Sequence, residues 1–200
     1  MYKNKIENYQ GDCEVLLGKY SQFSDYISNF AKSIDENSLV LDLGTGPQGC
    51  NSKFFKHCIL HGCDVETDVL ASLDKENYKN TFLFKLGHSE LPYSYNYLDC
   101  IVCSCVIQHL NSLEELNYGI ENIGQVLKAK GKFYLMFKAG NNNTLLTHYN
   151  TYYGEERTFR VFDPDYISSF SKKHNLQEMN REILLDSNWI PYCLLIFEKK

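Results

Sequence analysis

The most constraining feature of this 200-residue sequence is a glycine-rich turn that follows a short apolar run. The run covers residues 38–43 and is followed by Gly44, Gly46 and Gly49, after which apolar residues resume. This pattern predicts a buried strand, then a turn whose bare backbone a ligand can approach, then a helix over residues 49–56.

A second apolar run, over residues 58–63, ends at Asp64, twenty positions after Gly44. Adjacent parallel strands end at the same edge of a sheet, so Asp64 is expected beside the glycine turn, where its carboxylate can bind both hydroxyls of a ribose. Val65 follows it at the same edge. Together the turn and the acid predict a nucleoside-containing cofactor.

The glycine spacing alone fits a dinucleotide as well as S-adenosyl-L-methionine. Asp42, two residues before Gly44, favours S-adenosyl-L-methionine, because an acid there can orient the turn and face the cationic amino group of a methionine-like moiety. Pro47 also removes an amide that a pyrophosphate would meet. A nicotinamide-dependent oxidoreductase or a non-catalytic nucleotide-binding module is kept as an alternative.

Four ordered motifs over residues 38–138 resemble those of the class I S-adenosylmethionine-dependent methyltransferases, specifically the methyltransferase type 11 group. After the glycine turn with its acid, they read Gly87-His-Ser-Glu-Leu-Pro-Tyr93, Leu98-Asp-Cys-Ile-Val-Cys-Ser-Cys-Val-Ile-Gln-His-Leu110 and Val126-Leu-Lys-Ala-Lys-Gly-Lys-Phe-Tyr-Leu135. The resemblance implies an α/β, Rossmann-like fold with a seven-stranded, mostly parallel sheet of order 3-2-1-4-5-7-6. It also implies helices on both faces and a C-terminal antiparallel hairpin.

The end of the chain supports this fold independently of the glycine turn. Residues 181–186 and 192–198 are both strand-like, and the five residues between them cannot form a crossover, so the two strands must be antiparallel. Elsewhere strands are expected to alternate with helices, as in a parallel sheet. The expected strands are 38–43, 58–63, 80–85, 98–103 and 132–138, and the expected helices are 49–56, 67–77, 113–128 and 163–174.

Ligands on such a sheet lie beyond the carboxyl ends of the strands. By the resemblance, the glycine turn meets the methionine end of the cofactor, His88 and Ser89 lie beside the adenine, and the residues after strand 4 face the methionine carboxylate or sulfonium. His88 stands where many members carry an acid, and core packing is the favoured role of Cys103 and Cys105. The predicted cofactor-binding residues are Asp42, Gly44, Thr45, Gly46, Asp64, Val65, His88, Ser89, Cys103 and Ser104.

Methyl transfer requires little catalytic machinery, because the sulfonium is already a good leaving group and the enzyme mainly aligns the acceptor. A hydroxyl acceptor would benefit from a general base, and His109 and His148 are the candidates. In the family a histidine at the place of His109 often only closes the pocket, and this structural role is slightly preferred.

The chain is expected to form a single methyltransferase domain over residues 1–200, with an N-terminal helical lid over residues 1–37 and an acceptor-binding insertion over residues 139–162. The lid carries an amphipathic stripe and Tyr20, and the insertion mixes aromatic and directional polar groups that suit a polar small molecule. The alternative is a solvated loop with a helical turn over residues 145–152. The predicted acceptor-binding residues are Tyr20, Tyr149, Tyr153 and Arg157.

The net charge of −5 and the absence of any cluster of four or more cations favour a small-molecule acceptor over a nucleic acid. The content of residues 139–162 makes a polar, sugar- or phosphate-bearing metabolite the expected acceptor, methylated on oxygen or nitrogen. The tail from residue 157 to residue 189 nevertheless faintly resembles the ending of tRNA wobble-uridine methyltransferases, so an RNA methyltransferase stays an alternative.

The eight cysteines lie mostly within expected strands, which is typical of free buried thiols in a reducing cytoplasm. His57, Cys58, His61 and Cys63 straddle a helix end and a strand, so no metal site is expected. The sequence has no apolar run long enough for a membrane span and no signal-peptide core, and we expect a cytoplasmic protein. The oligomeric state is left open.

Overall fold

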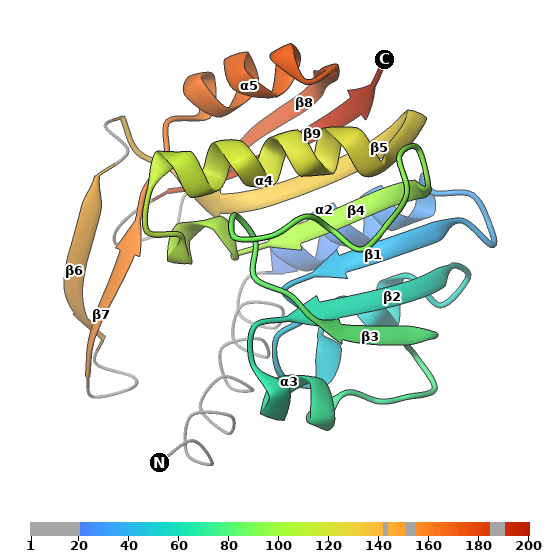
Figure 1. Cartoon of the computed structure of the whole chain (residues 1–200). Coiled ribbons are helices and arrows are strands. Elements are labelled where there is room, and N and C mark those ends of the chain that lie inside the picture. The colour runs from blue at the N-terminus through green and yellow to red at the C-terminus, as the bar shows by residue number, and fades with distance from the viewer. Residues whose placement is uncertain (1–20, 142–143, 151–154, 185–190) are drawn as a thin grey trace. The chain divides into compact units, whose positions relative to one another are not determined.

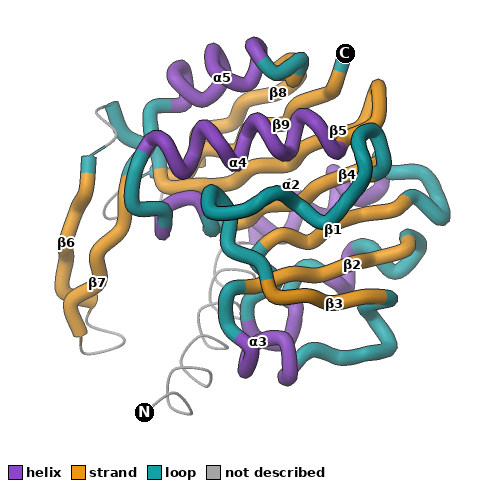
Figure 2. The backbone as a smooth tube through the Cα atoms, in the orientation of Figure 1, coloured by secondary structure: helices purple, strands orange, loops and turns teal. Residues whose placement is uncertain are grey.

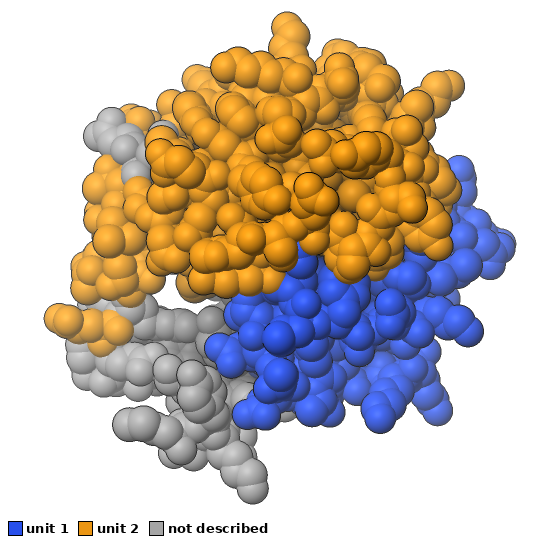
Figure 3. Space-filling view, in the orientation of Figure 1, with its two compact units in different colours: residues 1–84 blue, residues 85–200 orange. Residues whose placement is uncertain are grey.

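The computed structural model describes residues 21–141, 144–150, 155–184 and 191–200. The chain divides into two compact units, residues 1–84 and residues 85–200, which Figure 3 colours separately. Of the helices in these described ranges, none combines the length and apolarity needed to cross a lipid bilayer.

The first unit is built on three parallel strands. β2 pairs with both β1 and β3, and Val40 of β1 lies opposite Leu60 of β2. β1 is rich in apolar residues because an inner parallel strand is covered on both faces, and its Val40 and Leu41 are fully buried. The elements, shown in Figures 1 and 2, are α2 (Ser21–Lys32), β1 (Leu39–Leu43), η1 (Pro47–Gly49), η2 (Ser52–Phe54), β2 (Ile59–Asp64), α3 (Thr67–Ser72) and β3 (Asn80–Leu83).

The segment after the glycine turn departs from the prediction. The sequence predicts an α-helix over residues 49–56, but the structure has only the two single-turn 3-10 helices η1 and η2. Gln48 and Gly49 have φ angles of 61° and 59°, in the left-handed region that an α-helix excludes. α3 also ends earlier than the sequence predicts, because Leu73 adopts an extended backbone.

In the second unit, β5 (Leu127–Lys138) pairs in parallel with β4 (Leu98–Ser104) and antiparallel with β9 (Tyr192–Lys199). β9 also pairs antiparallel with β8 (Leu176–Leu184). In Figure 1, α4 and α5 lie side by side over the strands of this unit. Ser112 caps the N-terminus of α4, and its hydroxyl accepts the Glu115 amide at 3.2 Å. The elements are β4 (Leu98–Ser104), η3 (Ile107–His109), α4 (Leu113–Val126), β5 (Leu127–Lys138), β6 (Leu145–Asn150), β7 (Glu155–Arg160), α5 (Pro164–Lys173), β8 (Leu176–Leu184) and β9 (Tyr192–Lys199).

The strand order in the seven-stranded sheet is β3-β2-β1-β4-β5-β9-β8. This order confirms the predicted α/β fold with order 3-2-1-4-5-7-6, since the last two strands are numbered 8 and 9 only because β6 and β7 precede them. The β8–β9 ladder also confirms the predicted antiparallel C-terminal pair.

The insertion over residues 139–162 forms a small hairpin of its own. β6 and β7 pair antiparallel in a separate two-stranded sheet, which Figure 2 shows as two neighbouring strands. The alternative of a helical turn over residues 145–152 is therefore wrong where the structure describes it. β-branched residues favour the strand, and the Thr147 and Thr158 hydroxyls meet across the hairpin at 2.9 Å.

Candidate functional site

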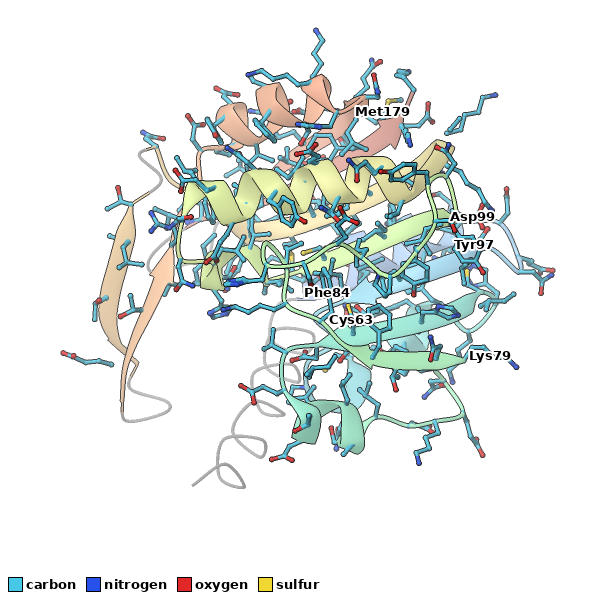
Figure 4. The ribbon with its side chains drawn as sticks, in the orientation of Figure 1. Cys63, Lys79, Phe84, Tyr97, Asp99 and Met179 are labelled. Carbon is cyan, nitrogen blue, oxygen red and sulfur yellow. The ribbon has the colours of Figure 1, made fainter. Side chains whose placement is uncertain are left out.

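The glycine turn is held against the carboxyl end of β2 by backbone hydrogen bonds. The amides of Gly44 and Thr45 donate to the carbonyl oxygen of Cys63, at 2.8 and 3.1 Å. Cys63, labelled in Figure 4, is buried among the side chains of the first unit. Gly44 and Gly46 have φ angles of 77° and 60°, a conformation that glycine adopts without steric cost.

Asp64 lies beside this turn, where the sequence places it. Its Oδ2 accepts the Gly46 amide at 3.1 Å, and its Oδ1 accepts the Glu66 amide at 3.2 Å. Burial raises the pKa of Asp64, and the two amide bonds oppose this shift. Each carboxylate oxygen can accept a further hydrogen bond, so Asp64 keeps the capacity to bind ribose hydroxyls.

Asp42 is fully buried, and both of its oxygens accept hydrogen bonds from the protein. Asn51 Nδ2 donates to Oδ1 at 2.9 Å, and the Tyr78 hydroxyl donates to Oδ2 at 2.7 Å. Burial raises the pKa of Asp42 to about 6. Asp42 therefore holds Asn51 and Tyr78, and its orienting of the turn stays a prediction. Its carboxylate has no exposed surface, which does not favour the predicted contact with a cationic amino group.

Two further residues of the first unit belong to the predicted cofactor edge. The Thr45 hydroxyl is buried and has no hydrogen-bond partner among the described residues. Buried polar groups are normally paired, so this orphaned oxygen in the glycine turn fits a site that a polar ligand completes. Val65 is 51% exposed next to Asp64 and offers an apolar surface at the same edge.

In the second unit, His88 forms a contact that the sequence analysis missed. His88 Nε2 lies 3.0 Å from Glu115 Oε1, and the Asn111 amide donates to Glu115 Oε2 at 2.9 Å. A carboxylate from the first turn of α4 therefore lies against His88. The capping-box spacing of Ser112 and Glu115 is the sequence signal that could have identified Glu115. Ser89, the second predicted adenine neighbour, is exposed.

The carboxyl end of β4 carries the other predicted cofactor residues. Cys103 is fully buried, which supports the core-packing role that the sequence favours. The Ser104 hydroxyl is buried without a hydrogen-bond partner in the described part of the chain, and this fits a polar ligand at the strand end. Cys105, directly after β4, has a φ of 59°, in the left-handed region, so the strand ends there.

The candidate bases and acceptor residues are located only in part. His109 ends η3 and is exposed, and η3 contacts β7 of the hairpin. The ladder pairs the backbone of His148 with that of Arg157, and that of Tyr149 with that of Glu156. Tyr20 and Tyr153 lie outside the described residues, and the side chains of His148, Tyr149 and Arg157 are not described.

A shallow hollow of about 450 Å³ lies in the first unit, near the start of β2 rather than at the glycine turn. It is therefore not part of the candidate site. Its lining residues are Cys58, Ile59, Leu60, Lys75, Glu76, Asn77, Tyr78 and Lys79. Within the described ranges, no group of three or more His, Cys, Asp or Glu side chains is arranged to hold a metal ion.

A known family model matches the middle of the chain. Residues 41–135 match the family model described as a methyltransferase domain. The matched segment contains the glycine turn, Asp64, the His88 segment, β4 and most of β5. This match confirms the recognition of a class I S-adenosylmethionine-dependent methyltransferase, and with it S-adenosyl-L-methionine as the cofactor. No curated protein matches the chain.

Solved structures share the fold at low sequence identity. An S-adenosylmethionine-dependent methyltransferase from Methanosarcina mazei aligns with a TM-score of 0.70 at 15% identity, over 85% of this chain and 96% of that one. The Burkholderia thailandensis 1,6-didemethyltoxoflavin-N1-methyltransferase, solved with bound 1,6-didemethyltoxoflavin and S-adenosylhomocysteine, aligns with a TM-score of 0.61 at 11% identity, over 99% of this chain and 89% of that one. A complex between the Haloferax volcanii Trm112 methyltransferase activator and a protein described as a methyltransferase gives 0.69 at 12% identity, over 96% and 95%. At these identities the likeness establishes the fold alone.

Proposed function

We propose that this protein transfers the methyl group of S-adenosyl-L-methionine to an oxygen or nitrogen atom of a polar small molecule, and that the β6–β7 hairpin binds this acceptor. The observation that carries the proposal is the position of the hairpin. It is inserted directly after the carboxyl end of β5, and the carboxyl ends of the strands are where sheets of this kind bind ligands.

The hairpin is anchored at its base, which suits a binding element better than an idle loop. Arg160 Nη2 donates to the Asn111 carbonyl at 2.6 Å, and the Phe162 amide donates to the Lys138 carbonyl at 3.2 Å. Phe159 and Phe162 are at most 5% exposed. A fixed base lets the outer part of the hairpin present its residues in a defined place.

Positive charge at this base supports an anionic acceptor. The ammonium of Lys138 lies 4.8 Å from the centre of the Phe159 ring and 4.5 Å from that of Tyr192. Arg160 adds a guanidinium on β7 at the same base. An arginine can hold a carboxylate or phosphate through two parallel hydrogen bonds.

The residues of the two units have separate roles in this proposal. S-adenosyl-L-methionine supplies an electrophilic methyl group on a good leaving group. The glycine turn and Asp64 bind and orient it, and the hairpin binds the acceptor. Where the acceptor is a hydroxyl, the imidazole of His109 or His148 takes its proton as the new bond forms.

Substitutions in the hairpin test the acceptor site. Tyr149→Ala, Tyr153→Ala and Arg157→Ala, made singly, are each expected to lower turnover about ten- to a hundredfold, because each removes an acceptor contact worth about 1.5–3 kcal/mol. The affinity for S-adenosyl-L-methionine is expected to stay near that of the unmodified protein. The measurement is release of S-adenosylhomocysteine with a panel of hydroxyl-, amine-, carboxylate- and phosphate-bearing metabolites, together with calorimetric binding of the cofactor.

Tyr95→Ala is the matched control, because the Tyr95 side chain is 70% exposed and lies outside the hairpin. Full activity of all three hairpin variants on the true acceptor would place the acceptor site elsewhere. Activity only on bulk tRNA, with an affinity that falls steeply as salt rises, would instead support the RNA methyltransferase alternative.

A further inference from the structure

Tyr78, which lies outside the four motifs, donates a hydrogen bond to the acid that precedes the glycine turn. Tyr78 lies in the loop between α3 and β3, and it is 5% exposed. Its hydroxyl donates to Asp42 Oδ2 at 2.7 Å, while Asn51 Nδ2 donates to Asp42 Oδ1 at 2.9 Å. Both oxygens of one buried carboxylate are therefore held by side chains of the same unit.

Two glycines make room for the Tyr78 ring. A Cβ atom at Gly49 would clash with the Tyr78 hydroxyl, and a Cβ atom at Gly62 would lie 2.8 Å from Tyr78 Cδ1. Real Cβ contacts are longer than this, so a larger residue at either position would displace the ring. Gly49, the last glycine of the turn, thus serves the packing of Tyr78.

The three side chains connect the two flanks of the turn. Asp42 belongs to β1 and precedes the turn, whereas Asn51 follows it, after η1. The segment after the turn forms 3-10 turns rather than the predicted α-helix, so it lacks the regular hydrogen bonds that a helix would provide. The Asn51–Asp42–Tyr78 network supplies fixed hydrogen bonds at this place instead.

We propose that Tyr78 and Asn51 are positioning residues for the cofactor: by holding Asp42, they keep the glycine turn in the conformation that binds S-adenosyl-L-methionine. This inference rests on the proposed function, because it assigns a role in cofactor binding to residues that need not touch the cofactor. Asp42 acts through the backbone of the turn, in which Gly44 and Gly46 are two and four residues away.

The charge on Asp42 matters to this network. Its partners both donate hydrogen bonds, so the ionised carboxylate satisfies both, whereas the protonated form must place its own proton against a donor. Burial raises the pKa of Asp42 to about 6, and the two donors oppose this shift. The other titratable groups that act on Asp42 are Asp64, Cys63 and Tyr78. The pKa values of the Cys63 thiol and the Tyr78 hydroxyl are raised well above their usual ranges, so both stay protonated near neutral pH.

Tyr78→Phe tests the inference, because it keeps the ring and removes only the donor. Calorimetry is expected to show S-adenosyl-L-methionine binding about tenfold weaker than in the unmodified protein at pH 7. In the unmodified protein, affinity should fall as the pH drops through about 6, where Asp42 takes up its proton. Without the Tyr78 donor the pKa of Asp42 rises further, so in Tyr78→Phe this fall should begin at a higher pH. Asp64 is present in both proteins, so the difference between their pH profiles reports the removal of the Tyr78 donor.

Asn51→Ala removes the other donor. It should also weaken S-adenosyl-L-methionine binding and move the fall in affinity to a higher pH. Tyr95→Phe is the matched control, since Tyr95 is 70% exposed and lies outside the network. A merely structural role would lower the melting temperature and leave the dissociation constant and its pH profile unchanged at 25 °C; that result in both variants would overturn the inference. Failure of the unmodified protein to bind S-adenosyl-L-methionine would instead refute the proposed function.

Discussion

Asp64→Ala is expected to weaken S-adenosyl-L-methionine binding about ten- to a hundredfold, because hydrogen bonds from ribose hydroxyls to a carboxylate are worth about 1.5–3 kcal/mol. The fold should persist, since burial already disfavours the charged form of Asp64 and raises its pKa. The substitution also removes the acceptor of the Gly46 amide, so the turn itself loses one of its hydrogen bonds. Calorimetric titration with the cofactor measures the effect.

Asp64→Asn provides a graded comparison, because the asparagine side chain keeps one acceptor oxygen. This variant should therefore lose less affinity for S-adenosyl-L-methionine than Asp64→Ala. Asp68→Ala is the matched control, since Asp68 is exposed in α3. An unchanged dissociation constant in folded Asp64→Ala would contradict the assignment of Asp64 to the cofactor site.

Removal of residues 187–200 is expected to abolish soluble expression. The sequence alone suggests that this deletion strips an edge strand, but β9 lies between β5 and β8 and pairs with both. Leu195 and Phe197 of β9 are fully buried, and each buried side chain of this size contributes about 1.5–3 kcal/mol. Loss of the whole strand therefore approaches the ~5–15 kcal/mol stability of a typical domain.

Fractionation of the expressed protein into soluble and insoluble parts, with circular dichroism of any soluble material, measures this effect. Deletion of Lys200 alone is the control, because its side chain is half exposed and the residue lies beyond β9. A soluble truncated protein that still binds S-adenosyl-L-methionine would show that the second unit does not depend on β9.

The parts of the fold that the sequence predicts well are those with regular patterns. Apolar runs identify the parallel strands, and the short connection before β9 requires an antiparallel pair. Asp64 could be placed beside Gly46 because neighbouring parallel strands end at the same edge, and the hydrogen bond of 3.1 Å between them agrees with that reasoning. These predictions depend only on periodicity and on strand direction.

The predictions that fail concern segments whose conformation depends on individual backbone angles or on side chains distant in the sequence. The α-helix after the glycine turn is absent because Gln48, not only glycine, takes a left-handed conformation. The role of Asp42 was incompletely predicted, because its partners Asn51 and Tyr78 come from segments without helical or strand periodicity. A hydrogen bond over 36 positions, as between Asp42 and Tyr78, leaves no local pattern in the sequence.

The β6–β7 hairpin was likewise predictable only in part. The unusual length of the 139–162 connection indicates an inserted element, but its strands are short and mixed in character, so periodicity alone could not exclude a loop. The anchor between Arg160 and the Asn111 carbonyl spans 49 positions and has no signal in the sequence.

The central claim is that S-adenosyl-L-methionine is the ligand of the glycine turn and Asp64. Its most direct test is isothermal titration of the full chain with S-adenosyl-L-methionine, S-adenosylhomocysteine, NAD and NADP at pH 7.5, roughly one unit or more above the pKa of Asp42. The account predicts saturable binding of S-adenosyl-L-methionine and S-adenosylhomocysteine, weakened in Asp64→Ala, with no comparable binding of either dinucleotide. Tight binding of NAD or NADP without binding of S-adenosyl-L-methionine would contradict it.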